Sequence, residues 1–142
     1  ETDKIVNIKK GQFMAPWDMH GVLSKTEGAK EVWITERGIC HGYNNLVVDF
    51  NGMQYMLDSY DVPLVFDATH SVQRPSANGV SSGGNRDYVA GLTRAASAMG
   101  VSHFFLEVHD DPDNAPSDGA NMLHLKDFER TIDDIMRYSY TS

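Results

Sequence analysis

Charged and metal-binding side chains stand at or just beyond the ends of four predicted strands. In chain order they are Lys9, Arg37, Asp67, His70, Glu107 and His109. Strands of soluble proteins rarely place a lysine on an inward-facing position, because burying an unpaired ammonium group costs much free energy. A bound anion removes this cost. The repetition of the pattern at four strand ends therefore predicts a polar ligand site where these ends meet.

The first of these strands displays the pattern most clearly. In the run VNIKKGQFMAP, the apolar Val6 and Ile8 alternate with the polar Asn7 and Lys9. A period of two residues is typical of a strand with two different faces. The same alternation points Lys10 away from Lys9, so Lys9 is the better candidate for the site.

Lys9 and Arg37 together have the chemistry of an anion site. Arg37 ends the run VWITERG, in which alternation places it on one face with Trp33 and Thr35. A planar guanidinium group makes bidentate hydrogen bonds to phosphate or carboxylate, whereas an ammonium group acts as a point charge. The alternative is a pair of surface charges that flank turns, and periodicity alone leaves both interpretations open.

The composition narrows the class of protein. A chain of 142 residues that is 41% hydrophobic has the size of one domain with its own core. A net charge of −8 argues against a nucleic-acid or anionic membrane surface as partner. Cys40 is the single cysteine, so the chain forms no internal disulfide and a reducing compartment is expected. No apolar run approaches the roughly 20 residues that span a bilayer.

Strands and helices are predicted to alternate along the chain. The predicted strands cover residues 5–9, 32–36, 64–68 and 103–108. The predicted helices cover residues 18–25, 46–57, 86–99 and 126–138, and Gly100 ends the third. The order βαβαβαβα favours an α/β fold with a parallel sheet and outer helices.

The polar strand ends favour part of a barrel over an open doubly wound sheet. Strands of a doubly wound sheet are near-continuous runs of Val, Ile and Leu, because both faces are buried. The inner positions here are polar or charged at the carboxyl ends, where the active sites of barrels are built. A complete eight-fold barrel needs about 250 residues, so the chain is interpreted as half of one.

Two long segments follow predicted strand ends. Residues 71–85 (SVQRPSANGVSSGGN) are rich in Gly and Ser, and residues 110–121 (DDPDNAPSDGAN) are acidic and rich in turn formers. A loop of about 15 residues in a compact domain is usually functional or disordered. The first segment, with Gln73, Arg74 and Arg86 near it, is a candidate lid over a sugar phosphate. The alternative is a solvated linker.

Five stretches of the sequence carry a resemblance to a known family. They are VNIKKGQFMAPWDM (6–19), TERGICHGYNNLVVDF (35–50), FDATHSVQRP (66–75), GGNRDYV (83–89) and LEVHDDPDNAPSDGANML (106–123). Over these stretches, in the same order, the chain resembles the 3-deoxy-D-manno-octulosonate 8-phosphate synthase family. The resemblance implies a TIM (β/α)8 barrel, of which residues 1–142 form a single domain that supplies about the last four βα units.

The resemblance also implies an activity. Members condense phosphoenolpyruvate with D-arabinose 5-phosphate, giving 3-deoxy-D-manno-octulosonate 8-phosphate and phosphate for lipopolysaccharide biosynthesis. They work as cytoplasmic homo-oligomers, so a homotetramer is implied for the complete enzyme, with neither nucleic acid nor a membrane as partner. One alternative is the related 3-deoxy-D-arabino-heptulosonate 7-phosphate synthase, which uses erythrose 4-phosphate. Another is a half-barrel that binds a metal or a second chain without catalysis.

Matching positions imply roles for individual residues. Lys9 and Arg37 are implied to bind phosphoenolpyruvate. The implied substrate-binding set is Lys9, Gln12, Arg37, Asn45, Gln73 and Arg74. The implied catalytic set is Lys9, Arg37, Asp67 and His70. The alternative interpretation of Gln12 and of Asn45 is that each only shapes the turn in which it lies.

The resemblance further implies a divalent metal at His70, Glu107 and Asp118. One imidazole and two carboxylates suit Zn²⁺, Mn²⁺ or Fe²⁺. The family's fourth ligand, a first-strand cysteine, has no match in this chain, and metal-independent members carry Asn there. Ser117 before Asp118 favours the metal-requiring branch. A histidine hydrogen-bonded for structural reasons is the alternative for His70. Asp67 either orients His70 or a neighbouring lysine, or caps its strand end.

Weaker signals come from other residues near these ends. Arg86 opens a helix beside two glycines and could hold phosphate there. His109 shares a face with Glu107 and is expected either in the site or in a water-exposed loop. The strand aromatics are expected to belong mostly to the core; they are Trp33, Phe66, Phe104 and Phe105.

Overall fold

A four-stranded parallel sheet forms the centre of the computed structural model, which describes residues 2–42, 44–75 and 83–139. Its strands are β1 (Thr2–Lys9), β2 (Ala29–Glu36), β5 (Leu64–Asp67) and β8 (His103–Phe105). All neighbours are parallel, in the order β1-β2-β5-β8. The spatial order therefore equals the chain order, with no reversal in the middle of the sheet. A doubly wound sheet requires such a reversal, whereas a barrel adds each strand beside the last. The predicted barrel segment is confirmed.

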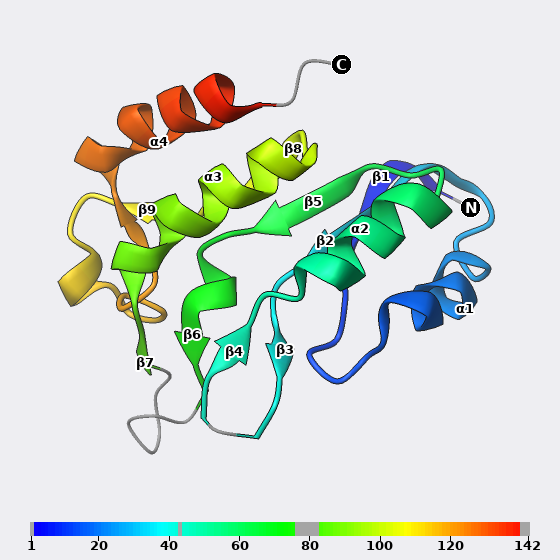
Figure 1. Ribbon diagram of the computed structural model, residues 1–142, viewed down its shortest axis with the longest axis horizontal. Coiled ribbons are helices and arrows are strands. Elements are labelled where there is room, and N and C mark those ends of the chain that lie inside the picture. The colour runs from blue at the N-terminus through cyan, green and yellow to red at the C-terminus, as the bar shows by residue number, and fades with distance from the viewer. Residues whose placement is uncertain (1, 43, 76–82, 140–142) are drawn as a thin grey trace.

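The described part of the chain has four α-helices, whose arrangement around the strands is visible in Figure 1. They are α1 (Met19–Leu23), α2 (Phe50–Ser59), α3 (Val89–Met99) and α4 (Leu125–Tyr138). Short 3-10 helices cover Pro16–Asp18, His70–Val72, Arg86–Tyr88 and Pro112–Asn114. In Figure 1, α3 and α4 lie side by side, and contacts between these two helices confirm that they pack together.

The hydrophobic core lies between the helices and one face of the sheet. Alternate strand residues such as Ile34 and Phe66 are buried there against Met53 and Met56 of α2 and Val89 of α3. The opposite sheet face carries Asn7, Lys9, Thr35 and other polar groups, as strand alternation requires. The sequence thus gives the sheet one face for the helices and one face for chemistry.

Within the described residues, six shorter strands form three separate two-stranded sheets that follow the carboxyl ends of the main strands. β3 (Ile39–Cys40) pairs antiparallel with β4 (Leu46–Val47), and β6 (Gln73–Arg74) pairs antiparallel with β7 (Gly83–Gly84). β9 (Val108–His109) pairs parallel with β10 (Leu123–His124). Figure 1 shows β3, β4, β6 and β7 gathered at one end of the molecule.

The hairpin of β3 and β4 corrects one predicted boundary. The second helix was expected from residue 46, but Leu46 belongs to β4 and α2 begins at Phe50. Asp49 caps α2, because its side chain accepts a hydrogen bond from Gly52 N at 3.0 Å. Apolar periodicity had merged a short strand with the helix that follows it.

Other expected boundaries also shift. The fourth strand, expected over residues 103–108, is divided into β8 and β9, which pair with different partners. The first helix ends at Leu23 rather than at residue 25, and the first two strands begin earlier than expected. Within the segment 71–85, residues 76–82 lie outside the described residues, so the predicted lid stays a prediction.

Lys10 and Glu36 form a buried ion pair on the helix side of the sheet. Their side chains are each 1% exposed, and Lys10 Nζ lies 3.3 Å from Glu36 Oε2. Lys10 Nζ also donates to the carbonyl oxygens of Gly11 and Met14, at 3.3 and 3.1 Å. Glu36 Oε1 accepts from Gly38 N at 2.6 Å. Lys10 therefore points away from Lys9, as alternation predicts, but its charge is buried and paired.

None of the helices in the described part of the chain combines the length and apolar character that crossing a membrane requires.

The substitution Glu36→Gln tests the electrostatic cost of the buried pair. Burial raises the pKa of Glu36 above its ordinary 4.5, and attraction to Lys10 and the hydrogen bond from Gly38 offset this only in part. A carboxyl group whose pKa is higher in the folded protein than in the unfolded chain makes its full contribution to the free energy of unfolding below pH 4.5. This contribution is lost as the pH rises through the folded-state pKa. We therefore expect the wild type to lose stability relative to Glu36→Gln between pH 4.5 and neutrality, measured by urea denaturation.

Glu129→Gln is the control, because it makes the same chemical change at an exposed position of α4. Its difference from the wild type should stay constant over this pH range. An equally constant difference for Glu36→Gln would contradict the argument from burial.

Candidate active site

A buried carboxylate on β5 connects this strand to the end of β1. Asp67, at the end of β5, has a fully buried side chain. Its Oδ2 accepts a hydrogen bond from Lys9 Nζ, at the end of β1, at 2.7 Å. Lys9 Nζ also lies 4.1 Å from the centre of the Phe105 ring on β8, within reach of a cation–π contact. The ammonium group is thus fixed between two neighbours while its side chain stays 38% exposed.

The same carboxylate holds the His70 ring. His70 Nδ1 lies 2.8 Å from Asp67 Oδ2, and His70 N donates to Asp67 Oδ1 at 3.0 Å. Burial alone would raise the pKa of Asp67, but hydrogen bonds from His70 and Lys9 outweigh it and lower the pKa below its ordinary value. Asp67 is therefore an anion that orients both His70 and Lys9, the two partners that the sequence offered as alternatives.

His70, Glu107 and Asp118 converge on one point, as the resemblance implied. One ligand atom from each lies within 4.8 Å of the others. His70 Nε2 is 3.2 Å from Glu107 Oε2, an oxygen that accepts no hydrogen bond from the described residues. Asp118 has φ +53°, a left-handed conformation that is strained for most side chains and that Asp tolerates. Such strain is found mostly at functional sites.

The donor set fits a divalent cation. His70 Nδ1 lies 2.8 Å from Asp67 Oδ2, and in the tautomer with its proton on Nδ1 the ring has a lone pair on Nε2. This lone pair faces the carboxylate of Glu107, an arrangement that repels unless a cation lies between the two groups. One imidazole and two carboxylates are ordinary ligands of Zn²⁺, Mn²⁺ or Fe²⁺. The cluster is compatible with a divalent metal ion.

Gln73 links Arg37 to this cluster. Arg37 Nη2 donates to Gln73 Oε1 at 2.5 Å, and Gln73 Nε2 donates to Asp118 Oδ1 at 2.6 Å. The Nε atom of Arg37 is buried and has no hydrogen-bond partner within residues 2–42, 44–75 and 83–139. Arg37 therefore has donor capacity left for a ligand beside the cluster.

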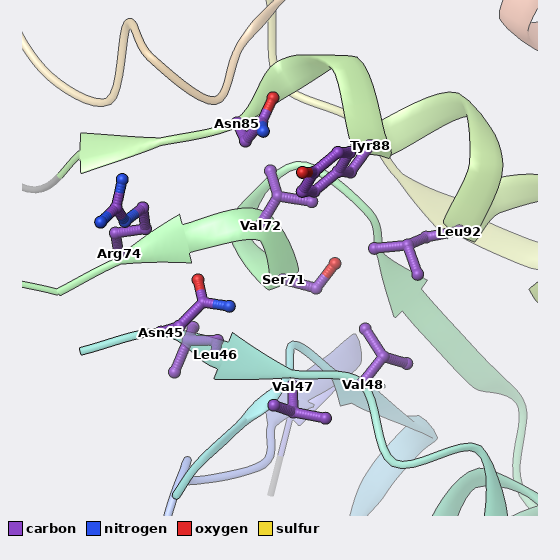
Figure 2. A pocket seen from close by; sticks show the side chains of 10 residues that line it. All are labelled: Asn45, Leu46, Val47, Val48, Ser71, Val72, Arg74, Asn85, Tyr88 and Leu92. Atoms are coloured by element: carbon purple, nitrogen blue, oxygen red, sulfur yellow. The ribbon is translucent and has the colours of Figure 1, made fainter. Parts of the chain in front are cut away.

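Two predicted substrate-binding residues lie elsewhere. Arg74 and Asn45 line a cavity of about 560 Å³ whose lining includes neither Gln73 nor any residue of the cluster (Figure 2). Strand alternation explains this, because Gln73 and its neighbour Arg74 in β6 point to opposite sides. The role of Asn45 and Arg74 in substrate binding stays a prediction.

Three further predictions about side chains can be compared with the structure. The backbone of Gln12 accepts a hydrogen bond from Cys40 N at 2.9 Å, while the role of the Gln12 side chain stays a prediction. The guanidinium group of Arg86 bonds to Asp113, the carbonyl of Gly119 and His124. It thereby holds the loop that carries Asp118. His109 Nδ1 accepts a hydrogen bond from Asp111 N at 2.9 Å. The His109 side chain thus contacts the loop that follows it, in line with the second of its two predicted positions.

Sequence reasoning missed Phe105 and Thr69 as parts of the site. Phe105 was assigned mainly to the core, but it is 37% exposed and lies beside Lys9 and His70. Alternation along β8 was the available signal, since it separates Phe105 from the core residue Phe104. Thr69 is fully buried and its Oγ1 accepts from Glu107 N at 3.1 Å, a contact without a sequence signal.

Comparisons with known proteins agree with this geometry. A sequence model described as the DAHP synthetase I family matches residues 1–138. A protein from Rickettsia bellii (strain OSU 85-389) named 2-dehydro-3-deoxyphosphooctonate aldolase is 54% identical over 139 residues, covering 96% of this chain and 50% of the relative. A protein of the same name from Rhodopseudomonas palustris (strain ATCC BAA-98 / CGA009) is 52% identical, covering 96% of this chain and 48% of that relative.

A solved structure supports the fold. The crystal structure of phospho-2-dehydro-3-deoxyheptonate aldolase (DAHP synthase) from Thermotoga maritima aligns with a TM-score of 0.77 and 26% sequence identity. The alignment covers 94% of this chain and 37% of that one. The predicted resemblance is confirmed, since the two named relatives carry another name of 3-deoxy-D-manno-octulosonate 8-phosphate synthase.

The chain spans about half the length of the curated relatives it matches. The family match nevertheless extends over nearly all of its residues. The chain belongs to the DAHP synthetase I family.

Proposed function

We propose that this chain forms the C-terminal half of a barrel enzyme that condenses phosphoenolpyruvate with D-arabinose 5-phosphate. Residues 1–142 would be a single domain of that barrel. The observation that carries the proposal is the chain of contacts that places Lys9 and Arg37 beside the His70–Glu107–Asp118 cluster. The names of the relatives from Rickettsia bellii and Rhodopseudomonas palustris support the same reaction.

The reaction needs concentrated positive charge. In the proposed reaction C3 of phosphoenolpyruvate attacks the aldehyde carbon of the sugar phosphate, and a carbon–carbon bond forms. Water adds to C2, and phosphate then leaves with cleavage of its bond to that carbon. Lys9 and Arg37 would bind the phosphate and carboxylate groups of phosphoenolpyruvate, because fixed cations in a partly buried site stabilise anionic groups strongly.

The chain's own residues would keep this arrangement rigid. Asp67 holds the Lys9 ammonium group and fixes the His70 ring with its Nε2 lone pair toward Glu107. Gln73 spans the gap between Arg37 and Asp118, so the anion site and the metal ligands stay in register. Preorganisation of this kind lowers the cost of reaching the reactive geometry.

We propose Zn²⁺, Mn²⁺ or Fe²⁺ for the site, held by His70, Glu107 and Asp118. When bound, such an ion would supply Lewis acidity toward the sugar aldehyde or orient a water molecule. The nitrogen and oxygen donors suit these ions better than Ca²⁺ or Mg²⁺, which prefer oxygen ligands alone.

The cellular setting of the proposal follows the resemblance. The complete enzyme would work in the cytoplasm as a homotetramer, with phosphoenolpyruvate and arabinose 5-phosphate as its small-molecule partners. It would supply the eight-carbon acid phosphate of lipopolysaccharide biosynthesis.

The second candidate is the heptulosonate reaction with erythrose 4-phosphate. It is favoured by the family description and by the Thermotoga maritima structure, whose printed name is that activity. The identity of 26% to that structure is well below the 54% to the Rickettsia bellii relative. The octulosonate reaction is therefore the better supported of the two.

Isothermal titration of the chain with Zn²⁺ or Mn²⁺ tests the metal site. We expect one ion per chain, and we expect Glu107→Gln and Asp118→Asn each to weaken binding by at least about 10-fold, because each removes a charged ligand. Asp133→Asn is the control, since Asp133 is exposed on α4. Wild-type affinity in the Asp118→Asn variant would exclude this residue as a ligand.

Phosphate release in the presence of phosphoenolpyruvate and either sugar phosphate tests the reaction. Because the chain spans half of its relatives, the assay combines it with the unmatched half of the Rickettsia bellii relative. We expect faster release with arabinose 5-phosphate than with erythrose 4-phosphate. The opposite preference would favour the heptulosonate reaction. No release with either sugar from a folded, metal-loaded complex would favour the half-barrel without catalysis.

A further inference from the structure

The buried pair lies directly behind the two cations of the site. Lys10 follows Lys9 in the sequence, and Glu36 precedes Arg37. The ends of β1 and β2 are neighbours, with Lys9 in register with Thr35 and Lys10 N donating to Thr35 O at 2.8 Å. At the end of β1, Lys9 points to the site and Lys10 to the helices. At the end of β2, Arg37 points to the site and Glu36 to the helices.

The contacts on the sheet face that carries Lys9 and Arg37 do little by themselves to hold Arg37 in place. Its side-chain hydrogen bond among the described residues goes to the neutral Gln73, whereas Lys9 has the carboxylate of Asp67. Two cations that serve one ligand repel each other until the anion arrives. The backbone ladder between β1 and β2 ends with the bond from Lys10 N to Thr35 O, so contacts beyond it must fix the spacing of the two side chains.

The buried pair has the bonds for this task. Lys10 Nζ connects Glu36 to the carbonyl oxygens of Gly11 and Met14, in the turn after β1. The other oxygen of Glu36 accepts from Gly38 N, in the turn after β2. The pair thus ties the turn that follows Lys9 to the turn that follows Arg37.

Stability is a poor explanation for such a pair. Removing two charges from water costs about as much free energy as their attraction returns, and apolar replacements of similar volume are often neutral or stabilising. An apolar pair could not make the directional hydrogen bonds that Lys10 and Glu36 make to the two turns.

We propose that Lys10 and Glu36 are positioning residues that set the spacing of Lys9 and Arg37 for a phosphorylated carboxylate ligand. The ligand class rests on the proposed function, whereas the positioning rests on the contacts of the buried pair.

The double variant Lys10→Met/Glu36→Leu separates positioning from stability. It removes both charges together and leaves no buried charge without a partner. We expect its free energy of unfolding to stay near that of the wild type, and its dissociation constant for phosphoenolpyruvate, measured by titration calorimetry, to rise at least about 10-fold. The matched control is Arg94→Met/Asp134→Leu, which removes an ion pair of 3.0 Å between α3 and α4. This control should leave the dissociation constant unchanged.

A crystal structure of the double variant gives a readout that needs no ligand. We expect the bond between Arg37 and Gln73 or the bond between Lys9 and Asp67 to lengthen beyond hydrogen-bond distance. If both bonds keep their lengths and phosphoenolpyruvate binds as to the wild type, the positioning role is refuted while the proposed function stands. If the wild type itself does not bind phosphoenolpyruvate, the proposed function fails, and the two bond lengths still decide the positioning role.

Discussion

The carboxylate of Asp67 is the contact on which the rest of the site depends. It is fully buried and accepts hydrogen bonds from Lys9 and His70, so one negative charge fixes the Lys9 ammonium group and one member of the His70–Glu107–Asp118 cluster. A buried carboxylate is costly unless charged or polar donors surround it. The hydrogen bonds that lower the pKa of Asp67 therefore also define the direction of both partners. Arg37, Gln73 and Asp118 extend this network to the other side of the site.

The fold makes this convergence possible through strand alternation. Alternate residues of β1, β2, β5 and β8, such as Ile8, Ile34 and Phe66, pack toward the helices, whereas the residues between them face the site. Parallel strands in chain order bring all four carboxyl ends to the same edge. Side chains from the loops that follow these ends can therefore contact one another directly. Gln73 bonds to Asp118, and Arg86 bonds to the carbonyl of Gly119.

Much of this arrangement could be predicted from the sequence, for physical reasons that differ between residues. A period of two residues marked Lys9 and Arg37 as candidates, because a charge on an inward strand position is costly without a partner, and the resemblance supplied their role. His70, Glu107 and Asp118 have no local spacing, so only the resemblance to a family grouped them. Side chains from separate strand ends are brought together by tertiary structure alone.

The errors also have physical causes. The resemblance gave Gln73 and Arg74 the same role, whereas adjacent residues of a strand face opposite sides, so the structure separates their side chains. Leu46 looked helical because a short apolar strand and a helix share a pattern, and the pairing of β3 with β4 decided between them. Alternation predicted only that Lys10 points away from Lys9, and its burial against Glu36 was missed because this partner lies on another strand. Long-range pairs of this kind leave no trace in local periodicity.

The most direct measurement is a crystal structure of the chain with Mn²⁺ and phosphoenolpyruvate, in which anomalous scattering locates the ion. The account predicts an ion bounded by His70 Nε2 and the carboxylates of Glu107 and Asp118, with the ligand's anionic groups between Lys9 and Arg37. An ion away from these three side chains, or a ligand in the cavity lined by Arg74, would contradict it.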